Sequence, residues 1–173
     1  KDCVFSENLA SGGGGMRVNK CLSAKLENIV VKNNISASNG GGVYLTGQGL
    51  NAELINVEVY GNEATNGAGL SIQSSCTVKL SDMKIYDNKA TSSSGGAIYM
   101  ASSVNVEMEN IEMYNNEAPK QGGGFYIGAG SSLKGNNLSV HNNRSGNIGG
   151  GSHSGGNTVL TNCVIANNAA DGN

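Results

Sequence analysis

The chain has 173 residues with a formal net charge of -2, and only 14% of its residues are charged. It lacks the basic surface that a nucleic-acid-binding protein needs, so we expect no nucleic-acid partner. No apolar run approaches the ~18 residues that span a bilayer, so we expect no membrane insertion by this segment. Gly, Asn and Ser make up 72 of 173 residues, as in many disordered chains, but the apolar residues are regularly placed.

One asparagine recurs at nearly constant spacing along the whole chain. Successive copies are 26, 28, 26, 28, 27 and 25 residues apart. We take it as the anchor of seven repeats: Asn8, Asn34, Asn62, Asn88, Asn116, Asn143 and Asn168. A period of this length is typical of solenoid proteins, in which each unit stacks on the next.

In chain order, each anchor is followed by glycines and then by a short apolar pattern. Gly40, Gly41 and Gly42, for example, precede Val43 and Leu45. Most variation in repeat length falls in this glycine turn, while the apolar segments keep their length. The pattern predicts a short strand after a corner that needs positive φ and close backbone approach.

Two more apolar segments lead to the next anchor. Leu54 stands eight positions before Asn62, and Val57 and Val59 stand five and three before it. This alternation with period two predicts short strands with one buried face. Six positions before the anchor every residue is Asn or Asp: Asp2, Asn28, Asn56, Asp82, Asn110, Asn137 and Asn162.

A unit of three short strands cannot bury its apolar face alone, so the units must stack. We therefore predict an all-β fold, a right-handed parallel β-helix of about seven coils of 25–28 residues with three short strands per coil. Residues 1–173 form a single β-helix segment in this interpretation. The chain opens in mid-pattern, without an initiating Met or signal peptide, so we expect a fragment of a longer solenoid.

Gly95-Gly96-Ala97-Ile98 has the form G-G-A-[ILV], and Phe5-Ser6-Glu7-Asn8 has the form F-x-x-N. The two tetrapeptides resemble the repeat motifs of the chlamydial polymorphic outer-membrane proteins. Residues 41–44 and 59–62 are looser versions. The resemblance implies an autotransporter-like adhesin at the cell surface, hence an extracellular or cell-surface location. The Tyr-rich form with three consecutive glycines departs from the bacterial pattern and leaves a distant, eukaryotic relative open.

The anchor column predicts a buried asparagine ladder in which each side-chain amide bonds the amide one coil away. Asn34, Asn137 and Asn143 also begin N-x-[ST] sequons. All three lie in Asn-rich columns that we interpret as ladders, so we expect their side chains to be unavailable for glycosylation.

Charged residues form columns of alternating sign. Nine positions before the anchor stand Lys25, Glu53, Lys79, Glu107 and Lys134, and four before it stand Glu58, Lys84 and Glu112. We predict that Glu107 lies close to Lys79 and Lys134, and Glu58 close to Lys84. Such pairs along the axis would set the register of the coils.

An enzyme of the pectate-lyase type, acting on polysaccharides, is the alternative function because such enzymes use the same architecture. It would need clustered acids, a base or calcium ligands on one outer face. The outward Glu and Lys cancel each other instead, and His141 and His153 show no neighbouring Cys or acid ligands in the sequence pattern. We expect no enzyme, no catalytic residues, no cofactor and no metal site.

The cysteines predict no obvious bridge. Cys3 and Cys163 share a predicted buried column but lie six coils, ~29 Å, apart. Cys21 and Cys76 are two coils, ~10 Å, apart. A Cys3–Cys21 link stays open, and buried free thiols or partners outside the segment are the default.

Tyrosines form two outward columns. Tyr60, Tyr86 and Tyr114 stand two positions before the anchor, and Tyr44, Tyr99 and Tyr126 stand just past the glycines. They either stabilise the coils by stacking or form an aromatic partner-binding surface. We predict a structural or adhesive rod that presents these columns to a protein or glycan at a cell surface, or to other copies in a fibre.

Overall fold

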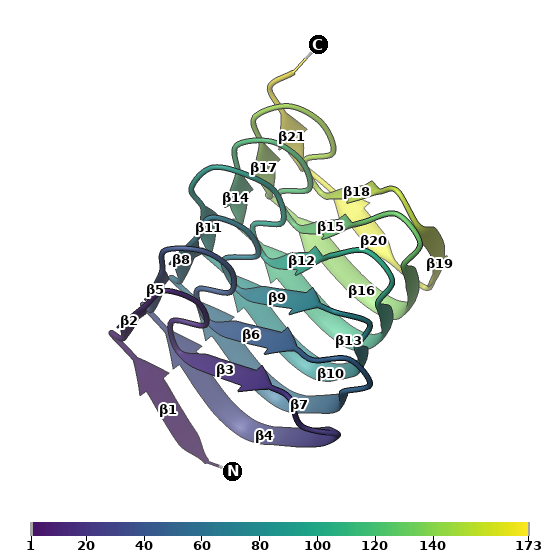
Figure 1. The fold of residues 1–173 in the computed structure, drawn as a ribbon. Coiled ribbons are helices and arrows are strands. Elements are labelled where there is room, and N and C mark those ends of the chain that lie inside the picture. The colour runs from purple at the N-terminus through teal and green to yellow at the C-terminus, as the bar shows by residue number, and fades with distance from the viewer. Residues whose placement is uncertain (1, 173) are drawn as a thin grey trace.

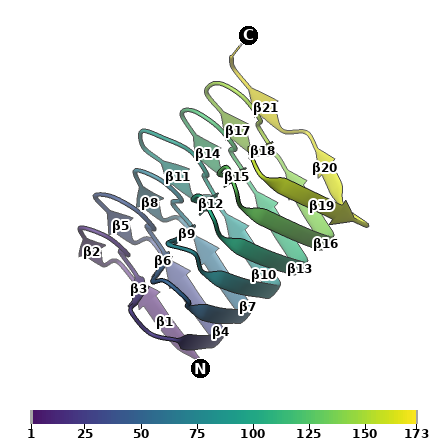
Figure 2. The ribbon, with the colours of Figure 1, turned by 45° about the vertical axis from the view of Figure 1, so that its right-hand side comes forward.

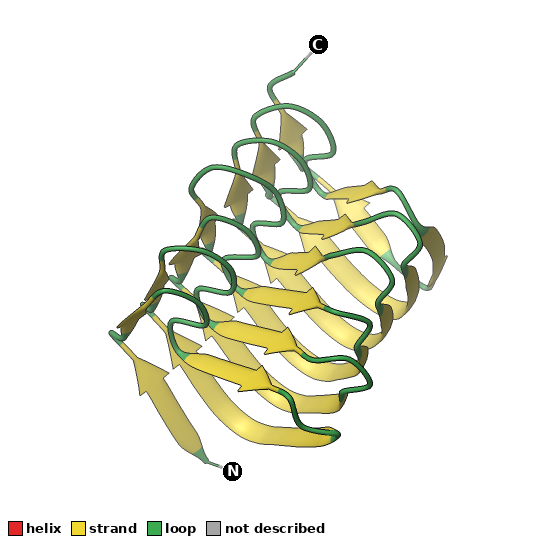
Figure 3. Ribbon diagram, viewed as in Figure 1, coloured by secondary structure: helices red, strands yellow, loops and turns green. Residues whose placement is uncertain are grey.

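The structure, a computed structural model, describes residues 2–172, and within that range it consists of strands and turns without a helix (Figure 3). The strands form three parallel sheets that wind around one axis, with the two termini at opposite ends of the stack (Figure 1). The described part of the chain therefore has no helix that is long and apolar enough to cross a membrane. Viewed from a second side, the coils repeat along the axis with little change in shape (Figure 2).

The first sheet takes its long strands from consecutive repeats. Its strands, in order along the axis, are β1 (Cys3–Ser6), β4 (Ser23–Lys32), β7 (Asn51–Tyr60), β10 (Thr77–Tyr86), β13 (Asn105–Tyr114), β16 (Ser132–His141) and β19 (Asn157–Thr161), with β20 (Val164–Ala166) also paired to β16. Each strand pairs in parallel with the equivalent residues of the next repeat, as in Ile85 with Met113 and Tyr86 with Tyr114.

The other two sheets are made of shorter strands. The second contains β2 (Leu9–Ala10), β5 (Ile35–Ser36), β8 (Glu63–Ala64), β11 (Lys89–Ala90), β14 (Glu117–Ala118), β17 (Arg144–Ser145) and β21 (Ala169–Ala170). The third contains β3 (Met16–Asn19), β6 (Val43–Thr46), β9 (Leu70–Gln73), β12 (Ile98–Met100), β15 (Phe125–Ile127) and β18 (Ser152–Ser154). Because the third sheet has six strands, the seven repeats make about six full turns.

The prediction of three strands per coil is confirmed, but the chain divides them differently. The two segments expected before the anchor form one ten-residue strand, such as β10, and a two-residue strand that we did not predict follows the anchor. The long strand stays continuous because its Asn or Asp bends it: Asp82 has φ 54° and Asn110 also has φ 54°. Asn and Asp tolerate this left-handed conformation better than other residues with a side chain.

The glycine corner has the conformation that the sequence predicts. Gly95 has φ 69°, and the equivalent Gly122 has φ 63°. A Cβ on the next glycine, Gly96, would lie 2.7 Å from the carbonyl oxygen of Glu117 and closer still to that of Gly123. The corner therefore needs glycine for conformation at one position and for space at the next.

The core lies inside the coil and is lined by rows of equivalent apolar residues. Leu54 and Leu80, which are 0% and 1% exposed, are stacked in one row, and Val59 and Ile85 in another at 0%. Alternate residues of the same strands point outward, so every coil presents its polar and aromatic side chains on the outer surface.

Candidate interaction surface

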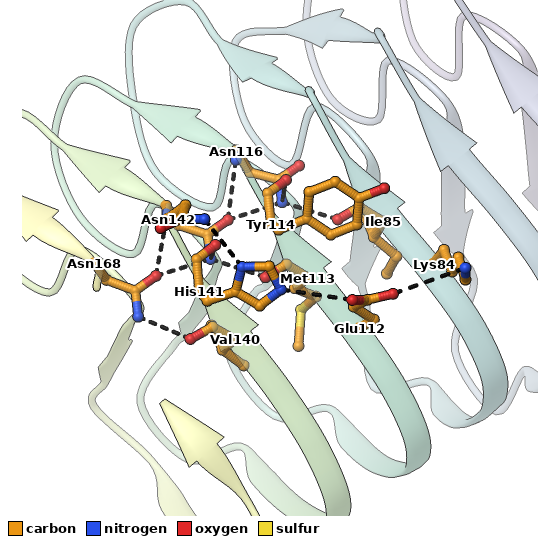
Figure 4. Close-up of polar contacts among 11 residues, drawn as sticks. Lys84, Ile85, Glu112, Met113, Tyr114, Asn116, Val140, His141, Asn142 and Asn168 are labelled. Atoms are coloured by element: carbon orange, nitrogen blue, oxygen red, sulfur yellow. Dashed lines mark hydrogen bonds and ion pairs between the residues drawn. The ribbon is translucent and has the colours of Figure 1, made fainter. Parts of the chain in front are cut away.

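The anchor asparagines form the predicted ladder. The side-chain Nδ2 of Asn88 donates to Oδ1 of Asn116 in the next coil at 3.0 Å, and the backbone N–H of Asn88 donates to the same oxygen at 3.1 Å. The same Nδ2 lies 3.0 Å from the carbonyl oxygen of Val59 and 2.9 Å from that of Tyr86. Asn143 continues the ladder to Asn168 at 2.9 Å. Figure 4 shows the neighbouring contacts of this region, including Asn168 with Val140.

Burial of the ladder depends on position along the stack. The five inner members are 0–1% exposed, namely Asn34, Asn62, Asn88, Asn116 and Asn143. Asn8 is exposed at one end and Asn168 half-buried at the other, because each has a neighbouring coil on one side alone. The inner anchors thus satisfy buried backbone and side-chain groups that would otherwise lack partners, which is a structural role.

The second Asn and Asp column forms a ladder on the outer surface instead. Nδ2 of Asn110 donates to Asp82, and Nδ2 of Asn137 donates to Asn110, both at 2.8 Å between exposed side chains. The expectation that Asn137 is unavailable because it lies in a buried ladder is therefore wrong. Its positive φ of 55° turns the side chain outward at the bend of β16.

The first tyrosine column forms a continuous stack that also includes a histidine. Ring centroids of Tyr60 and Tyr86 are 4.8 Å apart, as are those of Tyr86 and Tyr114, with interplanar angles of 5° and 2°. His141 continues the column at 5.4 Å from Tyr114 (Figure 4). The repeat spacing identified the three tyrosines as a candidate partner-binding column but did not include His141. The histidine ring can stack as a tyrosine ring does.

The second aromatic column is interrupted. Tyr99 and Tyr126 stack at 5.1 Å, and His153 continues the column at 5.6 Å from Tyr126. Tyr44 is separated from Tyr99 by Ser71, which pairs with both across the sheet. The guanidinium carbon of Arg17 lies 5.1 Å above the Tyr44 ring, a cation–π contact.

Stacking decides which part of each ring reaches a partner. Parallel rings at these spacings cover one another's faces, so the ring edges and hydroxyl groups are directed outward. Burial raises the pKa of Tyr86 above its usual 10.0, and the adjacent Glu58 carboxylate raises it further. Burial also raises the pKa of Tyr99 and of Tyr114. The columns thus offer rows of ring edges and hydroxyl groups rather than flat aromatic platforms.

The predicted charge columns lie on one outer face in the predicted register. Lys79 pairs with Glu107 at 3.8 Å. Lys84 pairs with Glu112 at 3.9 Å, as Figure 4 shows. Glu58 is aligned with Lys84, as expected, but its carboxylate accepts a hydrogen bond from the Tyr86 hydroxyl at 2.8 Å. The alignment of Glu107 with Lys134 is confirmed by the sheet register, although their ion pair is not formed.

A further charge column escaped the sequence analysis. One position after the anchor stand Glu63, Lys89, Glu117 and Arg144, which also alternate in sign. Lys89 pairs with Glu117 at 3.6 Å, and Arg144 pairs with Asp171 at 2.9 Å. The signal was present in the sequence, but this segment was not predicted to be a strand.

An open groove of about 520 Å³ follows the axis on the outer side of the first sheet. Its walls are the outward columns nine and seven positions before the anchor, and its floor is the strand backbone between them. The polar and charged lining residues are Glu53, Lys79, Ser81, Glu107, Glu109, Lys134, Asn136 and Thr161. The repeat pattern did not predict this groove, because the spacing of residues along the chain does not show the shape of the outer surface.

One expectation about the histidines is wrong. His141 has an acid neighbour after all, since its Nε2 lies 3.5 Å from a carboxylate oxygen of Glu112. Even so, no group of three or more His, Cys, Asp or Glu side chains that could hold a metal occurs among residues 2–172.

Cys76 is buried as predicted, and burial raises the pKa of its thiol. Cys3 is exposed and Cys163 half-buried, so the expectation of a buried column is wrong for this pair, which lies in the end coils. Cys21 is free, so the Cys3–Cys21 link left open by the sequence is not formed.

The fold and surface together define a parallel β-helical solenoid with ladders of like side chains on its outer face. The sequence model of the right-handed beta helix region matches residues 41–172. The chain therefore belongs to the right-handed beta-helix family, which confirms the predicted hand. Comparison with curated proteins and with solved structures found no match.

Proposed function

We propose that this chain is a non-enzymatic, extracellular structural and adhesive rod. It would resemble the surface-exposed repeat segments of the chlamydial polymorphic outer-membrane proteins. The observation that carries the proposal is the repetition of the same outward groups in successive coils. The Tyr60–Tyr86–Tyr114 column repeats a hydroxyl-bearing ring at 4.8 Å. A surface of this kind suits an extended partner or another rod, because weak contacts that repeat add through multivalency.

The chemistry of the column indicates how a partner would be recognised. Ring faces are covered within the stack, so contacts would be made through ring edges and hydroxyl groups. Those groups suit a protein or glycan that is rich in hydrogen-bond donors and acceptors. Tyr86 already donates to Glu58, so its hydroxyl oxygen remains as an acceptor toward the outside.

Two triple variants test the proposal. Replacing Tyr60, Tyr86 and Tyr114 with Phe keeps the rings and removes the hydroxyls, whereas replacing all three with Ser removes both. Binding would be measured on a glycan array, on cultured epithelial cells and, for self-association, by analytical ultracentrifugation. We expect the Phe variant to lose at least tenfold in apparent affinity with a nearly unchanged melting temperature.

The control is the matched pair Tyr99→Phe and Tyr126→Phe on the third sheet. If the control lost as much apparent affinity, adhesion would be assigned to the Tyr99–Tyr126 column or to both columns. Unchanged binding by the Ser variant, together with a lowered melting temperature, would assign the stack to stability alone and reject the proposed surface.

A polysaccharide-acting enzyme of the pectate-lyase type is the second candidate, and the groove along the first sheet is the observation that favours it. Glu107 and Glu109 on its walls supply carboxylates near Lys79 and Lys134. The test is incubation of the chain with polyuronate chains, with and without calcium, and measurement of newly formed chain ends. Product formation that disappears in Glu107→Gln or Glu109→Gln would favour the enzyme over the rod.

A further inference from the structure

The three N-x-[ST] sequons differ in whether their asparagine reaches solvent. Asn34 and Asn143 are 0% and 1% exposed. Each uses its Nδ2 inside the anchor ladder, with Asn34 donating to Asn62 at 3.0 Å and Asn143 to Asn168 at 2.9 Å. A sugar on either nitrogen would have to pass through the corner of the solenoid, so the folded coil excludes modification there.

Asn137 is the sequon asparagine that the fold presents at the surface. It lies at the bend of β16, where its positive φ directs an exposed side chain away from the core. Its Nδ2 donates to Asn110 on the N-terminal side at 2.8 Å. On the C-terminal side the surface ladder shifts, because Asn162 donates to Asn136 rather than to Asn137.

The surroundings of Asn137 leave room for a sugar. Both polar residues of its sequon, Asn137 and Ser139, line a shallow open depression of about 370 Å³ on the first sheet. Lys84 and Glu112 line the same depression and pair with each other at 3.9 Å. These groups offer hydrogen-bond partners to the hydroxyls of a first sugar residue.

We propose that Asn137 is the N-glycosylation site of this segment and that Asn34 and Asn143 are unmodified in the folded protein. In the reaction, Nδ2 forms a bond to the anomeric carbon of a lipid-pyrophosphate-linked oligosaccharide. The bond from that carbon to the pyrophosphate oxygen breaks, the lipid pyrophosphate leaves, and the amide loses one proton. The other N–H stays on Nδ2. The inference rests on the proposed extracellular location and on the eukaryotic relationship that the sequence leaves open, because the oligosaccharide donor lies in the secretory pathway of eukaryotic cells.

The test is secretion of the chain from cultured human cells behind an added signal sequence. Intact mass would be measured before and after peptide-N-glycosidase, which converts the modified asparagine to aspartate and so marks it in peptide mapping. We expect one glycan, on Asn137. Ser139→Ala should abolish it while keeping Asn137 and its hydrogen bond.

Ser145→Ala is the matched control because it removes the Asn143 sequon with little effect on the fold. The Ser145 hydroxyl is buried without a hydrogen-bond partner among the described residues, so its loss breaks no bond. This variant should still carry one glycan. An unmodified Asn137, or a glycan on Asn34 or Asn143 in the secreted protein, would overturn the proposal.

If a variant is not secreted, its glycosylation would be mapped by the same peptide analysis on protein recovered from inside the cells. There too, an unmodified Asn137 would overturn the proposal, and a glycan on it would support it. Occupancy is measured without a binding assay, so the glycosylation site and the adhesive function can fail independently.

Discussion

The hydroxyl group of Tyr86 donates a 2.8 Å hydrogen bond to the carboxylate of Glu58, which lies one coil toward the N terminus. The bond links the aromatic stack to the neighbouring charge column, and it takes the Glu58 carboxylate away from Lys84. It also couples the tyrosine stack to pH, because the phenol is the donor and the carboxylate the acceptor.

Tyr86 should make the fold sensitive to alkali. Its pKa in the folded protein is raised above the usual 10.0, so between these two values the folded state holds the proton and the unfolded state does not. The associated stability is present below the unfolded pKa and is lost as pH rises through the folded pKa. Above pH 10, the free energy of unfolding measured in urea should fall less steeply with pH in Tyr86→Phe than in the parent. Equal slopes would contradict the prediction.

Asn88→Ala should destabilise the solenoid by about 1–3 kcal/mol, because it leaves buried ladder partners without a bond. The backbone N–H of Asn62, which donates to Oδ1 of Asn88 at 3.0 Å, would lose this acceptor. The Nδ2 of Asn62 would lose its bond to Asn88 but keep those to the carbonyl oxygens of Val31 and Tyr60. Urea denaturation measures the change. The control is Asn105→Ala, where the side-chain bond to Ser132 is exposed, and a loss as large as that of Asn88→Ala would argue against a special role of the ladder.

Glu107→Lys should reduce the free energy of unfolding by roughly 1 kcal/mol, because three lysines would then stack in adjacent coils. The side chains of Lys79 and Glu107 are 62% and 57% exposed, so the effect is small and salt-sensitive. Glu107→Gln removes the attraction without adding repulsion, so its free energy of unfolding should lie between those of the parent and of Glu107→Lys. The difference between the variants should shrink in high salt, and a salt-independent difference would contradict charge pairing along the axis.

Gly96→Ala should cost about 2 kcal/mol or more, because the new Cβ meets the backbone of Glu117 and Gly123, which cannot rotate away as a side chain can. Thermal unfolding measures the loss. Gly12→Ala is the control, since its Cβ would meet only the Tyr44 ring at 3.7 Å and should be tolerated. If both variants have the same melting temperature, the close approach at the glycine corner does not limit stability.

The repeat pattern was enough to predict the solenoid, its repeat length, its buried rows and its anchor ladder. Stacking places each residue in nearly the same environment as its equivalent one coil away. Equivalent positions therefore require similar residues, and the columns are visible in a single sequence. The register of Lys79 with Glu107 and of Tyr60 with Tyr86 follows directly from this.

Which side chains pair, and which of them face solvent, depends on the three-dimensional packing of the coils. Asn137 and Asn143 both lie in asparagine columns, yet one is exposed and the other 1% exposed. The difference comes from backbone φ at the bend and from the neighbouring coils, which direct a side chain outward or into the corner. The directions of the side chains also determine that the tyrosine rings cover one another's faces and that Glu58 bonds to Tyr86 rather than to Lys84. Neither contact, nor the groove on the first sheet, follows from spacing along the chain.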